Sequence, residues 1–157
     1  MMRRVSLTDP EIEFDPDDPE GFRSGRFRAG RELGAKQTGA SLFELPPGQS
    51  ICPYHYEYGE EEWLLVMEGS PSVRTPEGTE QLGPRELVFF PMGPEGAHEI
   101  RNDTEDRVRV PLWATVVYPT ASAYPDSGKV GVWTGDKAED LMVERSSGVG
   151  YFHGESR

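Results

Sequence analysis

Cysteine and long apolar runs are nearly absent from this sequence of 157 residues. Cys52 is the only cysteine, so no internal disulfide can form, which favours a reducing, cytoplasmic location. No stretch of 18 apolar residues is present, which excludes a membrane-spanning helix. The first twenty residues contain two arginines but no apolar core, unlike a signal peptide. We therefore expect a cytoplasmic protein with no membrane partner.

Basic residues are also scarce. The chain has 16 lysines and arginines against 28 aspartates and glutamates, which gives a formal net charge of −12. Such a chain repels the phosphates of nucleic acids and of anionic lipids, so neither is an expected partner. The simplest interpretation of the acidity is that it keeps the protein soluble.

Segments that are free of glycine and proline and long enough for a stable helix are lacking as well. The chain has 18 glycines and 14 prolines, about a fifth of its residues, where average usage would give roughly 12%. They are scattered between apolar runs, which excludes both collagen and a bundle of long helices. The length suits one domain, residues 1–157. What remains is a β-rich domain with many tight turns.

The apolar runs between these turns predict seven or eight short strands at a spacing of roughly 8–12 residues, typical of a β-sandwich or barrel. The clearest candidates are residues 40–45, 61–67, 71–75, 87–91, 97–102 and 108–118.

The two ends of the chain lack this pattern. Residues 1–30 begin acidic and proline-rich, and we expect an irregular arm that packs on the body or on a neighbouring subunit. Residues 119–157 show no clear periodicity and predict a loop-rich tail with short extended pieces and a weak helical window at 137–144. The predicted core therefore spans about residues 40–118.

Two histidines lie among carboxylates. His55 and Glu57 are two residues apart, so on an extended chain they share a face. Glu62 follows a glycine-containing loop, and a hairpin would bring it back across from them. His98 begins another predicted strand. Two imidazoles and two carboxylates facing one interior are a plausible set of metal ligands. Alternatively, each histidine is an ordinary polar residue and the glutamates form a solvated acidic rim.

The order of these residues resembles the two motifs of the cupin superfamily over about residues 40–118. In the first motif, the six residues between Glu62 and Gly69 fix the register, and His55 takes the place of the first histidine. Gly48 lies one residue further upstream than usual. Glu57 stands where most of the family has a second histidine.

The second motif is matched by Pro91-Met92-Gly93, by His98, and by Asn102, with three residues between His98 and Asn102. Four residues separate Gly93 from His98, where the family usually has two.

The resemblance implies an all-β cupin double-stranded β-helix, also called a jelly roll, with a metal in its mouth. It leaves the activity open between a metal-dependent enzyme, either dioxygenase- or isomerase-like, acting on a small oxygenated metabolite and a non-catalytic module that binds a sugar or other small molecule. Cupins of this size often pair, so a homodimer is expected.

Two roles stay open for Glu57. As a fourth ligand it would give a divalent ion a formally neutral site, favouring iron or manganese over copper, with zinc and nickel still open. Alternatively His55, Glu62 and His98 hold the metal with open positions, an arrangement typical of non-haem iron chemistry, and Glu57 acts as a catalytic base.

Overall fold

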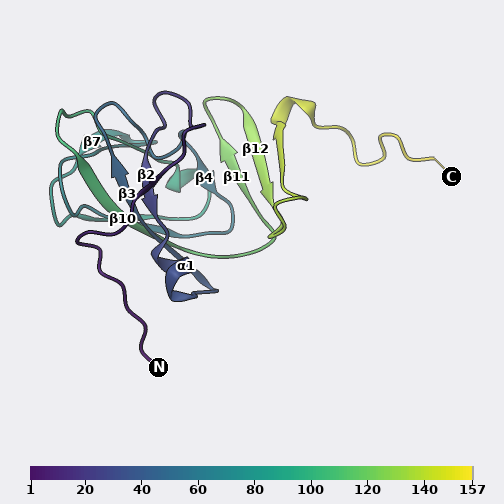
Figure 1. The fold of residues 1–157 in the computed structure, drawn as a ribbon. Helices are drawn as coiled ribbons and strands as arrows, with labels where there is room; N and C mark the ends of the chain where they lie inside the picture. The colour runs from purple at the N-terminus through teal and green to yellow at the C-terminus, as the bar shows by residue number, and fades with distance from the viewer. Residues whose placement is uncertain (157) are drawn as a thin grey trace.

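The computed structural model describes residues 1–156. Across these residues the chain forms thirteen short strands, one α-helix and two 3-10 helices (Figure 1). All strand pairs are antiparallel, and they group into sheets of six, four and three strands. The chain is thus an all-β jelly roll, as the sequence predicts.

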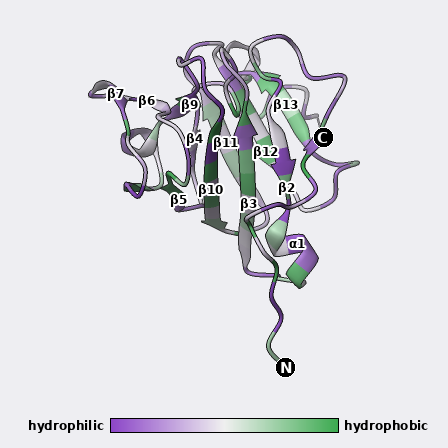
Figure 2. Cartoon of the chain, turned by 60° about the vertical axis from the view of Figure 1, so that its left-hand side comes forward, coloured by the Kyte–Doolittle hydropathy of each residue, from purple (hydrophilic) through white to green (hydrophobic). Residues whose placement is uncertain are grey.

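The largest sheet forms one wall of the molecule. Its strands, in spatial order, are β1 (Glu13–Phe14), β2 (Gly25–Phe27), β3 (Thr38–Leu45), β10 (Val108–Thr115), β5 (Glu62–Leu65) and β8 (Leu87–Phe90). β3 and β10 pair along their whole length, from Thr38 opposite Thr115 to Leu45 opposite Val108, and lie side by side in the middle of Figure 2. They are the longest strands, and they support the rest of the wall.

A three-stranded sheet covers the inner face of this wall. It consists of β7 (Gly78–Gln81), β6 (Ser72–Thr75) and β9 (Glu99–Arg101). The buried core cluster lies between the two sheets: Leu45, Leu64 and Val110 come from the wall, and Val73 and Ile100 from β6 and β9. Removing these apolar side chains from water is the main stabilising term of such a sandwich.

The four-stranded sheet differs from the sequence prediction. It consists of β13 (Leu141–Glu144), β12 (Lys129–Trp133), β11 (Thr120–Tyr124) and β4 (Tyr56–Glu57). The segment 119–157, expected to be loops with short extended pieces, supplies three paired strands of this sheet. The weak helical window at 137–144 is wrong, because β13 pairs with β12 there. After β13 comes the 3-10 helix η2 (Arg145–Ser147), and the chain then leads away from the body (Figure 1).

The predicted hairpin between His55 and Glu62 does not form. β4 pairs with β11, whereas β5 pairs with β10 and β8, so the two strands belong to different sheets. The loop between them crosses from one sheet to the other instead of turning back. His55 is instead bridged to His98, which joins the residue before β4 to the residue before β9.

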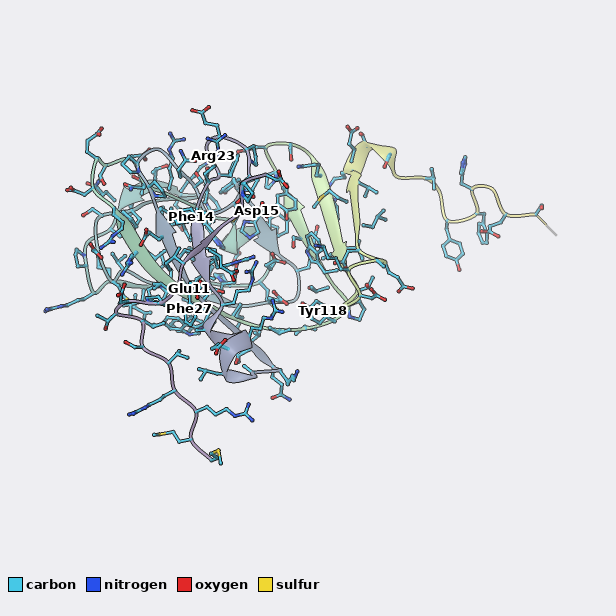
Figure 3. All side chains as sticks on the ribbon, in the orientation of Figure 1. Glu11, Phe14, Asp15, Arg23, Phe27 and Tyr118 are labelled. Carbon is cyan, nitrogen blue, oxygen red and sulfur yellow. The ribbon has the colours of Figure 1, made fainter. Side chains whose placement is uncertain are left out.

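The N-terminal segment packs on the body and is less irregular than expected. β1 pairs with β2, and Arg109 Nη1 donates to Thr8 O, which holds the arm against the outer side of the wall. Figure 3 shows Phe14 and Asp15 along this crossing segment. The only helix with α geometry in the described chain is α1 (Ala29–Leu33), and no helix there is long and apolar enough to cross a membrane.

Candidate metal centre

His55 and His98 form the base of the candidate site. Each donates its backbone N–H to the other's carbonyl, at 3.1 Å from His55 N and 2.8 Å from His98 N. This two-way bridge sets the imidazole centroids 4.9 Å apart. The side chains are largely buried, with 10% of His55 and 2% of His98 exposed.

Backbone carbonyls fix the tautomer of both rings. His55 Nδ1 lies 3.0 Å from Pro53 O, and His98 Nδ1 lies 2.8 Å from Gly96 O. A carbonyl only accepts, so each Nδ1 carries the proton and each Nε2 presents a lone pair. Metal-binding histidines are commonly oriented this way, by a hydrogen bond at the other ring nitrogen. Burial lowers the pKa of both imidazoles, that of His98 to about 3, so both are neutral near pH 7.

The unusual spacing of the second motif has a structural explanation. The residues between Gly93 and His98 include a 3-10 helix, η1 (Pro94–Gly96), and the carbonyl of Gly96 is the one that accepts from His98 Nδ1. Gly96 packs so closely on the backbone of Pro91 that a side chain would collide there. The longer gap is thus taken up by a 3-10 turn that ends two residues before His98.

Glu62 completes a group of three. Its Oε2 lies 3.4 Å from His98 Nε2 and 3.9 Å from His55 Nε2, and the ligand atoms of the three residues all lie within 4.8 Å of one another. A carboxylate facing two lone pairs is repulsive unless a proton or a cation lies between them. Accordingly, burial, reinforced by the neighbouring Glu57, raises the pKa of Glu62 to about 8. The donor set is therefore complementary to a metal ion, which would replace that proton.

Glu57 lies beside this group and outside it. Its Oε1 is 3.5 Å from His55 Nε2, so the side chain points inward as its spacing from His55 predicts. Burial raises the pKa of Glu57 to about 7, although a hydrogen bond from Ser122 opposes the rise. The structure thus brings together all four predicted residues. Metal ligation by them stays a prediction.

Ser122 and Trp133 connect Glu57 to the four-stranded sheet. Ser122 Oγ lies 2.6 Å from Glu57 Oε2, and Trp133 Nε1 lies 2.6 Å from the same Oγ. Indole N–H only donates, so Ser122 accepts from Trp133 and its own proton is directed to Glu57. Sequence reasoning missed both residues. The signal that could have found them is the Asp126-Ser127-Gly128 turn between two alternating segments, a hairpin pattern.

Aromatic rings pack against both histidines of the site. Phe90 stacks on His98 with centroids 3.7 Å apart, and Tyr124 stacks on His55 at 5.8 Å. Phe90 belongs to the buried core cluster as well as to the wall of the site. Tyr56 and Tyr58, which alternate with His55 and Glu57 along the chain, pair through their hydroxyls outside the metal group.

Cys52 and His153 lie outside the group. Cys52 Sγ is 3.5 Å from His55 Nδ1, on the side away from the site, and burial raises the pKa of its thiol, which keeps it protonated. His153 is exposed beyond β13.

Comparison with known families agrees with this geometry. The family model described as the cupin domain matches residues 41–117, which include all four candidate residues. The chain belongs to the cupin superfamily. A search of the curated proteins found no match to the sequence.

Solved structures share the cupin fold. A sugar phosphate isomerase of the cupin superfamily from Silicibacter pomeroyi has a TM-score of 0.80 at 20% identity, covering 92% of this chain and 94% of that chain. A putative sugar phosphate isomerase from Acidithiobacillus ferrooxidans has a TM-score of 0.76 at 22% identity, covering 83% and 81%. A polyketide cyclase from Streptomyces resistomycificus has a TM-score of 0.61 at 28% identity, covering 73% and 80%. The two isomerases are similar to this cupin in fold alone.

Proposed function

We propose that this cupin is a metal-dependent isomerase that moves a proton between neighbouring carbons of a small hydroxy-carbonyl compound. The observation that carries the proposal is the position of Glu57: a carboxyl group beside, but outside, the group formed by His55, Glu62 and His98. Such a group can exchange protons with a substrate held at the metal. The isomerase neighbours support the same reaction class.

His55 Nε2, His98 Nε2 and the Glu62 carboxylate would hold the ion, which we propose to be iron or manganese. When bound, it would polarise the substrate carbonyl and stabilise negative charge on the adjacent oxygens. Three protein ligands leave positions for two substrate oxygens. A formally +1 site, from a dication and one carboxylate, suits a neutral or enediolate-forming substrate.

Glu57 would act as the base. With a pKa of about 7, its carboxylate is well matched to accept a proton near neutral pH and to return it. It would take the proton from the carbon that bears the hydroxyl group and deliver it to the former carbonyl carbon. The hydroxyl proton would pass to the former carbonyl oxygen, so the reaction needs no oxidant. The Ser122 hydroxyl holds Oε2, which leaves Oε1 as the atom that carries the proton.

A second candidate is a dioxygenase. Two histidines and one carboxylate with open positions are also the ligand set of non-haem iron oxygenases. The two activities differ in one measurable respect, because an isomerase consumes no dioxygen.

The test incubates the metal-loaded protein with hydroxy-ketones in deuterated water, under air and under argon. We expect deuterium to enter the carbon next to the carbonyl in both atmospheres, and we expect Glu57→Gln to abolish incorporation while retaining metal. Oxygen-dependent product would favour the dioxygenase. Saturable binding without deuterium exchange or product would identify a non-catalytic binding module.

We also propose a cytoplasmic homodimer. Support comes from sheet edges with exposed apolar residues, Phe14 on β1 and Leu141 and Met142 on β13. Pairing with a second copy would cover such an edge. Light scattering coupled to size exclusion should give twice the chain mass of 17.5 kDa, and a 17.5 kDa particle would contradict the dimer.

A further inference from the structure

A cleft of about 370 Å³ adjoins the candidate metal centre. Glu57 lines the cleft and lies 3.5 Å from His55 Nε2, so the cleft meets the centre at this side chain. Trp133 also lines the cleft and is bonded to Ser122, which holds Glu57. Tyr118, labelled in Figure 3, forms its outer edge with Gly135, where an added Cβ would lie 3.2 Å from the tyrosine ring. The volume is suitable for a small metabolite.

Acidic side chains outnumber basic ones in the lining of the cleft. Glu57, Glu60 and Asp140 line it, and Lys137 is the one basic residue in its lining. Glu60 is anchored, because its Oε1 accepts from Val117 N, and Asp140 Oδ1 accepts from Thr134 N. These bonds hold the two carboxylates at the cleft, whereas Lys137 is exposed on the loop after β12. Without counting Glu57, two anchored carboxylates face one exposed ammonium.

We propose that this cleft is the substrate site and that it selects an uncharged polyhydroxylated compound, such as a free sugar or polyol, over its phosphorylated form. The inference rests on the proposed function and specifies its substrate class. A phosphate monoester carries close to two negative charges near pH 7, and the anchored carboxylates repel it. Hydroxyl groups, by contrast, can donate to the same carboxylates. The negative charge of the whole chain reinforces the discrimination against anions.

Trp133 suits this ligand class. Its Nε1 is held by Ser122, so the indole is fixed in place where it lines the cleft. A fixed aromatic surface contacts the C–H face of a sugar without requiring a charge on it. The cleft thus combines an apolar wall with anchored acceptors, which is the pattern expected for a neutral polyol.

The test compares two matched pairs of probes, ribitol with ribitol 5-phosphate and ribulose with ribulose 5-phosphate. Their binding to the metal-loaded protein is measured by calorimetry at low, matched ionic strength. Ribitol has no carbonyl group, so its binding is read without turnover. We expect each phosphorylated probe to bind about tenfold more weakly than its neutral partner.

Two glutamine variants then test whether the charge of Glu60 causes the discrimination against the phosphorylated probes. Glu60→Gln retains an acceptor for Val117 N, and we expect it to reduce the preference for each neutral probe over its phosphorylated partner about fivefold. Glu61→Gln removes the same charge one residue away, from an exposed side chain that does not line the cleft, and should change every affinity less than twofold. Equal effects of both variants would assign the discrimination to the net charge of the chain and overturn the role of the cleft.

The outcomes separate this inference from the proposed function. A protein that binds metal but prefers the phosphorylated probes, with that preference lost in Lys137→Gln, overturns the substrate class alone. A protein that retains no metal and binds none of the four probes overturns the proposed function and the substrate class together. Metal retention with tighter binding of the neutral probes and the stated Glu60→Gln effect supports both.

Discussion

Ser122 Oγ donates to Glu57 Oε2 across 2.6 Å, although the two residues are 65 positions apart in the chain. The bond joins β11, in a segment that the sequence suggested to be a loop-rich tail, to the carboxylate that replaces the usual second histidine of the first cupin motif. It gives Glu57 a fixed orientation beside the candidate metal ligands, which an exposed acidic residue would not have.

Ser122→Ala should change the acid-base behaviour of Glu57 without releasing metal. The hydroxyl lowers the pKa of Glu57, so its loss should move that pKa upward, and the rate of proton exchange at neutral pH should fall about 10- to 100-fold. The pH profile of the exchange rate is the measurement. Ser146→Ala, on an exposed helical turn, serves as the control. An unchanged profile in Ser122→Ala would show that Ser122 does not position Glu57.

His98→Gln should abolish metal retention. The variant removes one of the two lone pairs that point into the site, and the loss of one of three ligands strongly weakens binding. Elemental analysis of protein purified without chelator measures the effect. His153→Gln, exposed beyond β13, should keep the metal content of the unmodified protein. Circular dichroism checks that both variants are folded, and equal metal content in them would contradict the assignment of His98.

The stability of the metal-free protein should fall as pH rises from about 5 to 8. The pKa values of Glu57 and Glu62 are raised on folding, to about 7 and about 8, so the folded state holds these protons more tightly than the unfolded state. That contribution is fully present below the ordinary carboxyl pKa and is lost as pH rises through the raised values.

Protonation of His98 limits the stability of the fold at acidic pH, and a bound cation changes the stability at alkaline pH. Burial lowers the pKa of His98 to about 3, so its contribution is lost as pH falls from about 6.5 toward 3. A bound cation favours the ionised carboxylates, so added manganese should stabilise the protein more at pH 8 than at pH 5. Thermal unfolding at both pH values, with manganese and with EDTA, measures this. Equal manganese shifts at the two pH values would argue against carboxylate ligation.

Asn102→Ala should destabilise the fold by at least about 2 kcal/mol, since it leaves several buried polar groups without partners. Its Nδ2 donates to Leu45 O and Asp106 O, and its Oδ1 accepts from Thr104 N. Urea unfolding gives the free energy of unfolding. Gln81→Ala, at an exposed residue, should change it by less than about 0.5 kcal/mol. A similar loss in both variants would contradict this role of Asn102.

Much of this arrangement could be predicted from the sequence. The apolar runs located β3, β5, β8 and β10 to within a few residues, because alternating burial in an antiparallel sheet leaves a period of two. The spacing of the cupin motifs identified four candidate residues that lie together in the structure: His55, Glu57, Glu62 and His98.

The partner of β4 could not be predicted. A local hairpin with β5 is the simplest pairing that the sequence offers for β4. In the structure, β4 pairs instead with β11, more than sixty residues later. Local sequence carries little information on such long-range pairing. The strands β11 and β12 are short and contain serine, glycine and lysine, so their apolar signal is weak. Ser122 and Trp133 were missed for that reason.

Anomalous diffraction across the iron and manganese edges, from crystals of protein purified without chelator, tests the central claim most directly. We predict one strong anomalous peak bound by His55 Nε2, His98 Nε2 and Glu62, with Glu57 outside the ligand set and its Oε2 still held by Ser122. Crystals of protein produced in metal-supplemented medium that show no peak between these three residues would contradict the account.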